Sequence, residues 1–214
     1  MAVLIFDLDG TLIDTGQLAI SAYRRVLINY GYTPDELPTD EQILKTFGLP
    51  DTEIWSTLMA KHSDPALHRL AFRESGDLIY ADMEQNAVLL PHARDVLVAL
   101  KRQGHTLTTA SNCGQQYLDA VLDTQGIREF FDSPLCLETV KGTKKSDILR
   151  EHLTRYDRED CVMIGDRSTD RDAAVEVDMA FIGCNFGFGD RTELAGAECI
   201  IQSLPELVQY MSNR

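Results

Sequence analysis

The sequence is poor in basic residues and has no long apolar run. Lysine and arginine number 20 against 34 aspartates and glutamates, and the formal net charge at pH 7 is −14. Phosphate backbones and anionic membranes attract clustered positive charge, so neither a nucleic acid nor a membrane is an expected partner. No stretch approaches the roughly 18 apolar residues of a membrane-spanning helix. The N-terminus lacks the basic region of a signal peptide, and a cytoplasmic location is predicted.

Closely spaced cysteine pairs, internal repeats, low-complexity tracts and flexible linkers are also missing from the sequence. The five cysteines are scattered, and no two have Cys-x-x-Cys spacing, so neither a zinc site nor a disulfide framework is predicted. Hydrophobic residues make up 44% of the 214 residues and charged residues 25%, as is usual for a globular protein with a real core.

Short apolar runs that end in polar residues predict the strands of a parallel sheet. The runs are Ala2–Phe6, Thr106–Ala110, Cys161–Ile164 and Met179–Ile182. Amphipathic stretches between them, such as Ala93–Gln103, predict helices. Strands that alternate with helices indicate an α/β fold, a Rossmann-like parallel sheet with helices on both of its faces.

The segment between the first two predicted strands is far too long for an ordinary crossover. Its periodicity predicts helices over residues 19–30, 40–47, 51–61 and 66–83, separated by glycine and proline. We therefore predict an inserted, all-helical cap domain at residues 16–89. Residues 1–15 and 90–214 would form the Rossmann-like core.

Two pairs of aspartates follow predicted strands. Asp7 and Asp9 come directly after the first strand and are followed by Gly10, which lets the chain turn. Asp166 and Asp170 come after the strand at 161–164. In parallel sheets the carboxyl ends of strands lie at one edge, so the two pairs can meet over one cation. Mg²⁺ suits such a group because it prefers oxygen ligands.

Two other polar segments could hold a phosphate. Ser111 and Asn112 follow the second strand and can donate hydrogen bonds to phosphate oxygens. Lys141, Lys144 and Lys145 precede a helix predicted over residues 146–153, and a lysine there could neutralise phosphoryl charge or could simply be solvated. Taken alone, Ser111 is also a routine helix cap.

These segments, in this order, resemble the four motifs of the haloacid dehalogenase superfamily. Residues 6–15, Phe-Asp-Leu-Asp-Gly-Thr-Leu-Ile-Asp-Thr, are similar to its first motif, and Ser111 matches the second. A lysine near 144 matches the third motif, and Gly165-Asp166 with Asp170 matches the fourth. The position of the insertion resembles the type 1 cap of phosphoglycolate phosphatase-like and β-phosphoglucomutase-like members.

The resemblance implies a Mg²⁺-dependent phosphatase. Asp7 would attack phosphorus and form an aspartyl-phosphate, and Asp9 would act as general acid and base. Ser111 and Lys144, preferred here over Lys141, would hold the phosphoryl oxygens. The metal ligands would be Asp7, Asp166, Asp170 and the backbone carbonyl of Asp9. Dehalogenases of the superfamily lack the second aspartate, so Asp9 favours phosphate-ester chemistry.

The sequence indicates the substrate and its binding residues less specifically than it indicates the reaction. Gly10, Thr11, Asn112 and Gly48 are the candidate substrate-binding residues, with Gly48 in a cap loop that would face the active site. The expected substrate is a small phosphorylated metabolite, and the expected assembly is a monomer or a homodimer. A phosphomutase shares every core residue and stays an alternative. A binding protein without turnover is a weaker one, since it would have no need of all the acidic residues.

Overall fold

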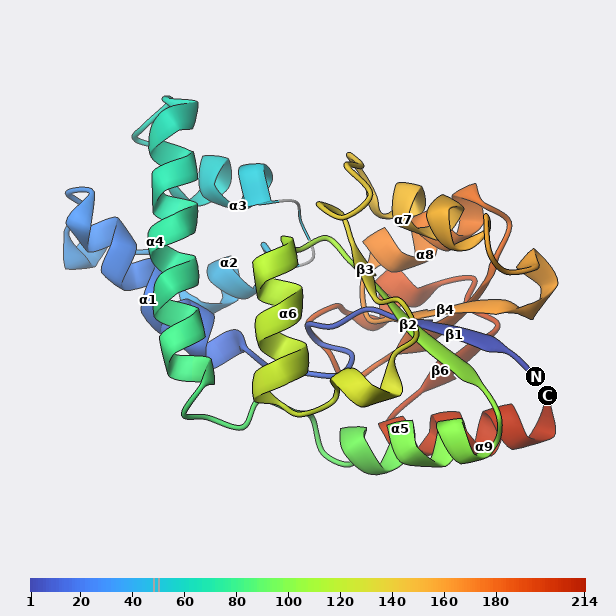
Figure 1. The fold of residues 1–214 in the computed structure, drawn as a ribbon. Coiled ribbons are helices and arrows are strands. Elements are labelled where there is room, and N and C mark those ends of the chain that lie inside the picture. Colours follow the sequence, from blue (N-terminus) through green and yellow to red (C-terminus); the bar gives the residue numbers. More distant parts are fainter. Residues whose placement is uncertain (48, 50) are drawn as a thin grey trace. The chain divides into compact units, whose positions relative to one another are not determined.

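The structure is a computed structural model that describes residues 1–47, 49 and 51–214. The chain divides into two compact units. One contains residues 1–14 and 89–214, and the other contains residues 15–88. The first unit holds the sheet, and the second is helical (Figure 1).

Within the described residues, six parallel strands form one sheet in the order β3-β2-β1-β4-β5-β6. The strands are β1 (Val3–Phe6), β2 (Thr106–Ser111), β3 (Leu135–Cys136), β4 (Cys161–Gly165), β5 (Ala180–Cys184) and β6 (Cys199–Ile201). The four predicted strands are β1, β2, β4 and β5. The prediction omitted β3 and β6, which have only two and three residues and thus show no readable pattern.

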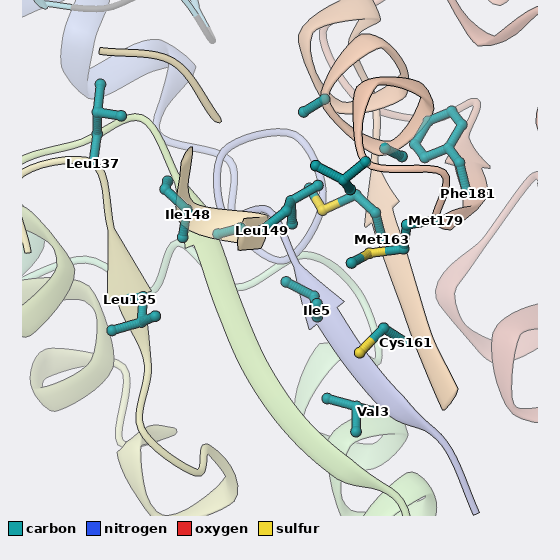
Figure 2. Packing of buried hydrophobic residues seen from close by; sticks show 14 of the residues in the cluster. Val3, Ile5, Leu135, Leu137, Ile148, Leu149, Cys161, Met163, Met179 and Phe181 are labelled. Carbon is teal, nitrogen blue, oxygen red and sulfur yellow. The ribbon is translucent and has the colours of Figure 1, made fainter. Parts of the chain in front are cut away.

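Helices cover both faces of the sheet, so the predicted α/β fold is confirmed. In Figure 1, α7 and α8 lie on one face, and α5 and α9 lie together on the other. Figure 2 shows the packing on the α7 and α8 side, where Ile5 of β1 and Met163 of β4 lie among buried aliphatic side chains. The helices of this unit are α5 (Ala93–Arg102), α6 (Gln115–Thr124), α7 (Lys145–His152), α8 (Ser168–Glu176) and α9 (Leu204–Asn213).

The second unit packs its own apolar core. Its helices are α1 (Gly16–Asn29), α2 (Asp40–Leu44), α3 (Asp51–Leu58) and α4 (Pro65–Met83). The Tyr23 ring of α1 lies 5.2 Å from the fully buried Trp55 ring of α3, measured between centroids. Arg24 forms an ion pair of 2.6 Å with Asp40. The role of this unit as a substrate cap stays a prediction.

Across the part of the chain that the structure describes, none of the helices has the length and apolar character needed to cross a membrane.

Candidate active site

The strand register brings the predicted motifs to one edge of the sheet. Phe6, the last residue of β1, pairs with Thr109 of β2 on one side and with Ile164 of β4 on the other. The backbone N–H of Asp7 still donates to the Ile164 carbonyl, at 2.9 Å. Asp7 therefore leaves the sheet between the two neighbouring strands, where their own polar ends begin.

A tight turn follows Asp7. The N–H groups of residues 11–13 all donate to the Leu8 carbonyl, at 2.8–3.1 Å. Gly10 has a φ of 80°, which side chains other than hydrogen rarely tolerate. A Cβ at this position would also overlap with the Asp166 carboxylate. The glycine is thus required both for the turn and for the close approach of Asp166.

Three buried carboxylates meet at this edge. Asp7, Asp166 and Asp170 each offer one oxygen, and the three oxygens lie within 4.8 Å of one another. Asp166 and Asp170 are fully buried, and Asp7 is 3% exposed. Three carboxylates buried this close together repel one another when all are charged, so the arrangement calls for protons or cations.

Backbone N–H groups hold two of these carboxylates in place. Asp166 Oδ2 accepts from the N–H of Phe188 at 2.6 Å and from that of Gly189 at 3.2 Å. Asp170 lies in the first turn of α8, and its Oδ2 accepts from Arg167 N at 2.9 Å. The Phe-Gly-Phe-Gly turn at residues 186–189 is therefore part of the site.

The lysine of the site is Lys145, and the prediction of Lys144 is wrong about which lysine reaches Asp7. Lys145 Nζ lies 2.8 Å from Asp7 Oδ1 and also pairs with Asp170 Oδ1, and its side chain is 2% exposed. Lys144 instead pairs with Glu176 at 2.5 Å, with more than half of its side chain exposed. Lys141 lies exposed in a turn with a φ of 53°.

The first residue of α7 explains why Lys145, and not Lys144, reaches Asp7. The predicted helix began at Ser146, but α7 begins at Lys145, and Lys144 is its extended N-cap. Lys145 then shares one helix face with Ile148, Leu149 and His152, at spacings of three, four and seven residues. The His152 ring bonds the Thr109 carbonyl at 2.8 Å and so fixes this face on β2. That periodicity was readable in the sequence and identifies Lys145.

Burial and mutual repulsion dominate the electrostatics of the cluster. Burial raises the pKa of Asp7 well above its usual range, although the Lys145 ammonium opposes this rise. Burial and the neighbouring Asp170 raise the pKa of Asp166 to about 7. Burial lowers the pKa of Lys145, but the carboxylates of Asp170 and Asp7 outweigh it, and the net pKa is raised. Lys145 is therefore charged at neutral pH.

The other predicted residues occupy different places around the cluster. The Asp9 side chain is half-buried, and its Oδ1 accepts from the Tyr117 hydroxyl at 2.7 Å. Thr11 Oγ1 donates to Asp166 Oδ1 at 3.4 Å. Ser111, the last residue of β2, and Asn112 after it are buried. The substrate-binding roles of Gly10, Thr11 and Asn112 stay predictions, and Gly48 lies outside the described residues.

The positive charge of Lys145 offsets the charge of only one of the three carboxylates when all are ionised. A further cation could neutralise the remaining negative charge. Carboxylate oxygens are hard ligands and suit a divalent cation such as Mg²⁺. In octahedral Mg²⁺ coordination, ligand oxygens lie roughly 3–4 Å apart, given metal–oxygen distances of about 2.1 Å. The spacing of the three carboxylates, all within 4.8 Å, is compatible with that geometry.

The chain is similar in sequence to a known protein family and to several known proteins. The model of the family "Haloacid dehalogenase-like hydrolase" matches residues 4–184. A "Probable phosphatase IndB" of Dickeya dadantii is 27% identical over 96% of this chain and 91% of its own length. A "Pyrophosphatase PpaX" of Bacillus velezensis is 29% identical over 79% of this chain and 76% of its own length.

The fold is also found among solved structures. The crystal structure of a predicted phosphatase from Clostridium acetobutylicum superimposes with a TM-score of 0.84 and 24% sequence identity. The match covers 100% of this chain and 99% of the other. The family match spans most of the chain and includes all three carboxylates of the cluster together with Lys145. The resemblance predicted from the motifs is confirmed, and the chain belongs to the haloacid dehalogenase-like hydrolases.

Proposed function

We propose that the protein is a Mg²⁺-dependent phosphatase that hydrolyses a small phosphomonoester through an aspartyl-phosphate on Asp7. The observation that carries this proposal is the environment of the Asp7 carboxylate. It lies buried at the end of the central strand, bonded to Lys145 at 2.8 Å and next to Asp166 and Asp170. A rigid strand end beside the Lys145 ammonium suits a nucleophile that must meet an anionic phosphoryl group.

The proposed reaction has two displacements at phosphorus. In the first, an Asp7 oxygen bonds to phosphorus while the bond from phosphorus to the alcohol oxygen breaks, and Asp9 gives that oxygen its proton. In the second, Asp9 takes a proton from water, whose oxygen attacks phosphorus. Inorganic phosphate leaves and the Asp7 carboxylate is restored. The Lys145 ammonium offsets charge on the phosphoryl oxygens during both displacements.

Asp7, Asp166 and Asp170 are the side chains that would hold Mg²⁺, with the backbone carbonyl of Asp9 as a further proposed ligand. The bound cation would supply charge neutralisation at the phosphoryl group. Lys145 would keep two of the carboxylates, Asp7 and Asp170, oriented before the substrate arrives. The Phe188 and Gly189 N–H groups would orient the third, Asp166.

Binding of Mg²⁺ is expected to strengthen as the pH rises from 5 to 8. The pKa of Asp166 is about 7 in the folded protein, above its unfolded value. Protonated Asp166 therefore adds stability at low pH, and this contribution is lost between about pH 4 and pH 7. A divalent cation must displace that proton, so its apparent affinity should fall by up to about tenfold per pH unit below 7.

The measurement is the shift in melting temperature on adding MgCl₂, at pH 5 and at pH 8, with NaCl at equal ionic strength as the control. The shift should be clearly larger at pH 8, and Asp166→Asn should reduce the shift at both pH values because it removes one of the proposed ligands. Shifts of equal size at the two pH values would contradict a site in which cation and proton compete.

Hydrolysis assays test the proposed function itself. The proposal predicts Mg²⁺-dependent release of phosphate from p-nitrophenyl phosphate and from members of a panel of small phosphate esters. The panel should include phosphoglycolate, sugar phosphates, glycerol phosphate, nucleotides and pyrophosphate, since the similar proteins include a probable phosphatase and a pyrophosphatase. Rates at background level for every compound, with and without Mg²⁺, would overturn it. Conversion of one sugar phosphate into another without phosphate release would favour the phosphomutase.

A further inference from the structure

Tyr117 contacts the proposed general acid and base of the site. Its hydroxyl donates to Asp9 Oδ1 at 2.7 Å, and both side chains are half-buried. The two residues are 108 positions apart in the sequence, and Tyr117 belongs to none of the four motifs. A hydrogen bond of this length to a carboxylate is of the stronger, charge-assisted kind.

The helix that carries Tyr117 is firmly anchored. The N–H of Gln115, the first residue of α6, donates to Glu138 Oε2 at 2.6 Å. The Gln115 side chain accepts from Thr139 Oγ1, also at 2.6 Å. Further along α6, Leu118, Val121 and Leu122 are buried. These contacts hold the first turn of α6, and with it the tyrosine, against the loop after β3.

Asp9 lies in the turn after β1, outside the regular strands and helices, and the Tyr117 hydroxyl is one of its side-chain contacts. General acid–base catalysis depends on the placement of the carboxyl group to within a fraction of an ångström, because a misplacement of about 1 Å can cost two orders of magnitude in rate. The Tyr117 hydroxyl holds one carboxylate oxygen and thereby limits rotation of the side chain.

We propose that Tyr117 is a positioning residue that orients the Asp9 carboxyl group for proton transfer to and from the substrate oxygen. This inference rests on the proposed phosphatase function. It extends the site from the strand ends to the first turn of α6. Tyr117 acts through Asp9 and does not itself take part in a displacement.

The dependence of the Tyr117→Phe effect on the leaving group tests this role. An alkyl phosphate needs a proton on its leaving oxygen, whereas p-nitrophenolate leaves without one. Tyr117→Phe should lower kcat/KM about tenfold for the best alkyl phosphate of the panel and less than twofold for p-nitrophenyl phosphate. Tyr210→Phe is the matched control, because it removes a hydroxyl bonded to an exposed carboxylate, Glu198, at 2.7 Å.

Equal losses of kcat/KM on both substrates would mean that Tyr117 only supports the fold. No loss of kcat/KM on either substrate would mean that the hydrogen bond does not affect catalysis. Each of these two results overturns the inference. An Asp9→Asn background gives a second reading. There, Tyr117→Phe should cause no further loss on the alkyl phosphate, and a full tenfold loss would contradict the role. If the wild-type protein hydrolyses no phosphate ester, the proposed function and this inference both fail. If the wild type is active and Tyr117→Phe changes kcat/KM on neither substrate, only this inference fails.

Discussion

Replacement of Asp7 by asparagine is expected to lower kcat at least about 10³-fold on every phosphate ester that the protein hydrolyses, because it removes the proposed nucleophile. The fold should persist. Burial raises the pKa of Asp7, so removal of its charge relieves a desolvation cost. Lys145 also keeps its second partner, Asp170. Steady-state rates and the melting temperature of the same preparations check both expectations.

Asp172→Asn is the matched control for this variant. It makes the same chemical change on α8, at a side chain that is 65% exposed and paired with Arg171. Its rates should equal those of the wild type. Asp7→Asn with substantial activity and an intact fold would place the nucleophile elsewhere.

Replacement of Lys145 by methionine is expected to weaken both stability and catalysis, while Lys144→Met changes neither strongly. Methionine keeps much of the side-chain volume, so the loss is mainly of charge. Removing one partner from a buried ion pair costs about 3–5 kcal/mol of unfolding free energy. Water screens the exposed pair of Lys144 with Glu176, so its loss should change the unfolding free energy far less. On activity, loss of a group that stabilises transition-state charge costs about 10²–10³-fold in kcat.

The two lysine variants are compared by urea unfolding in a chelator at pH 8, where bound cations cannot compensate for the lost ammonium. At pH 5 the destabilisation by Lys145→Met should shrink, because burial raises the pKa of Asp7 and this former partner of the ammonium can bind a proton instead. A larger loss of activity or stability in Lys144→Met than in Lys145→Met would contradict the assignment of Lys145 as the lysine of the site.

The sequence predicts the sheet and the carboxylate cluster well because both depend on local signals. The four strands β1, β2, β4 and β5 each correspond to an apolar run in the sequence. Asp7, Asp166 and Asp170 follow such runs closely. The parallel register then brings these aspartates to one edge of the sheet, because Phe6 aligns with both Thr109 and Ile164. Conversely, β3 and β6 are held by their neighbours in the sheet and carry too few residues for a pattern of their own.

The lysine was harder to predict because a helix rotates its side chains by about 100° per residue, given 3.6 residues per turn. A one-residue error in where α7 begins exchanges the buried Lys145 for the exposed Lys144. Tyr117 could not be predicted, because its contact with Asp9 depends on the packing of α6 and no local pattern reports that packing.

The most direct test of the account is chemical trapping of the aspartyl-phosphate. The protein is mixed with a saturating substrate and Mg²⁺, quenched in acid and reduced with borohydride, which converts an acyl phosphate into an alcohol. Mass spectrometry of the peptides should then find homoserine at position 7, dependent on substrate and absent from the Asp7→Asn variant. The account would be contradicted if an active protein carried the reduced residue at another position. It would also be contradicted if the protein hydrolysed the substrate and no reduced residue were found.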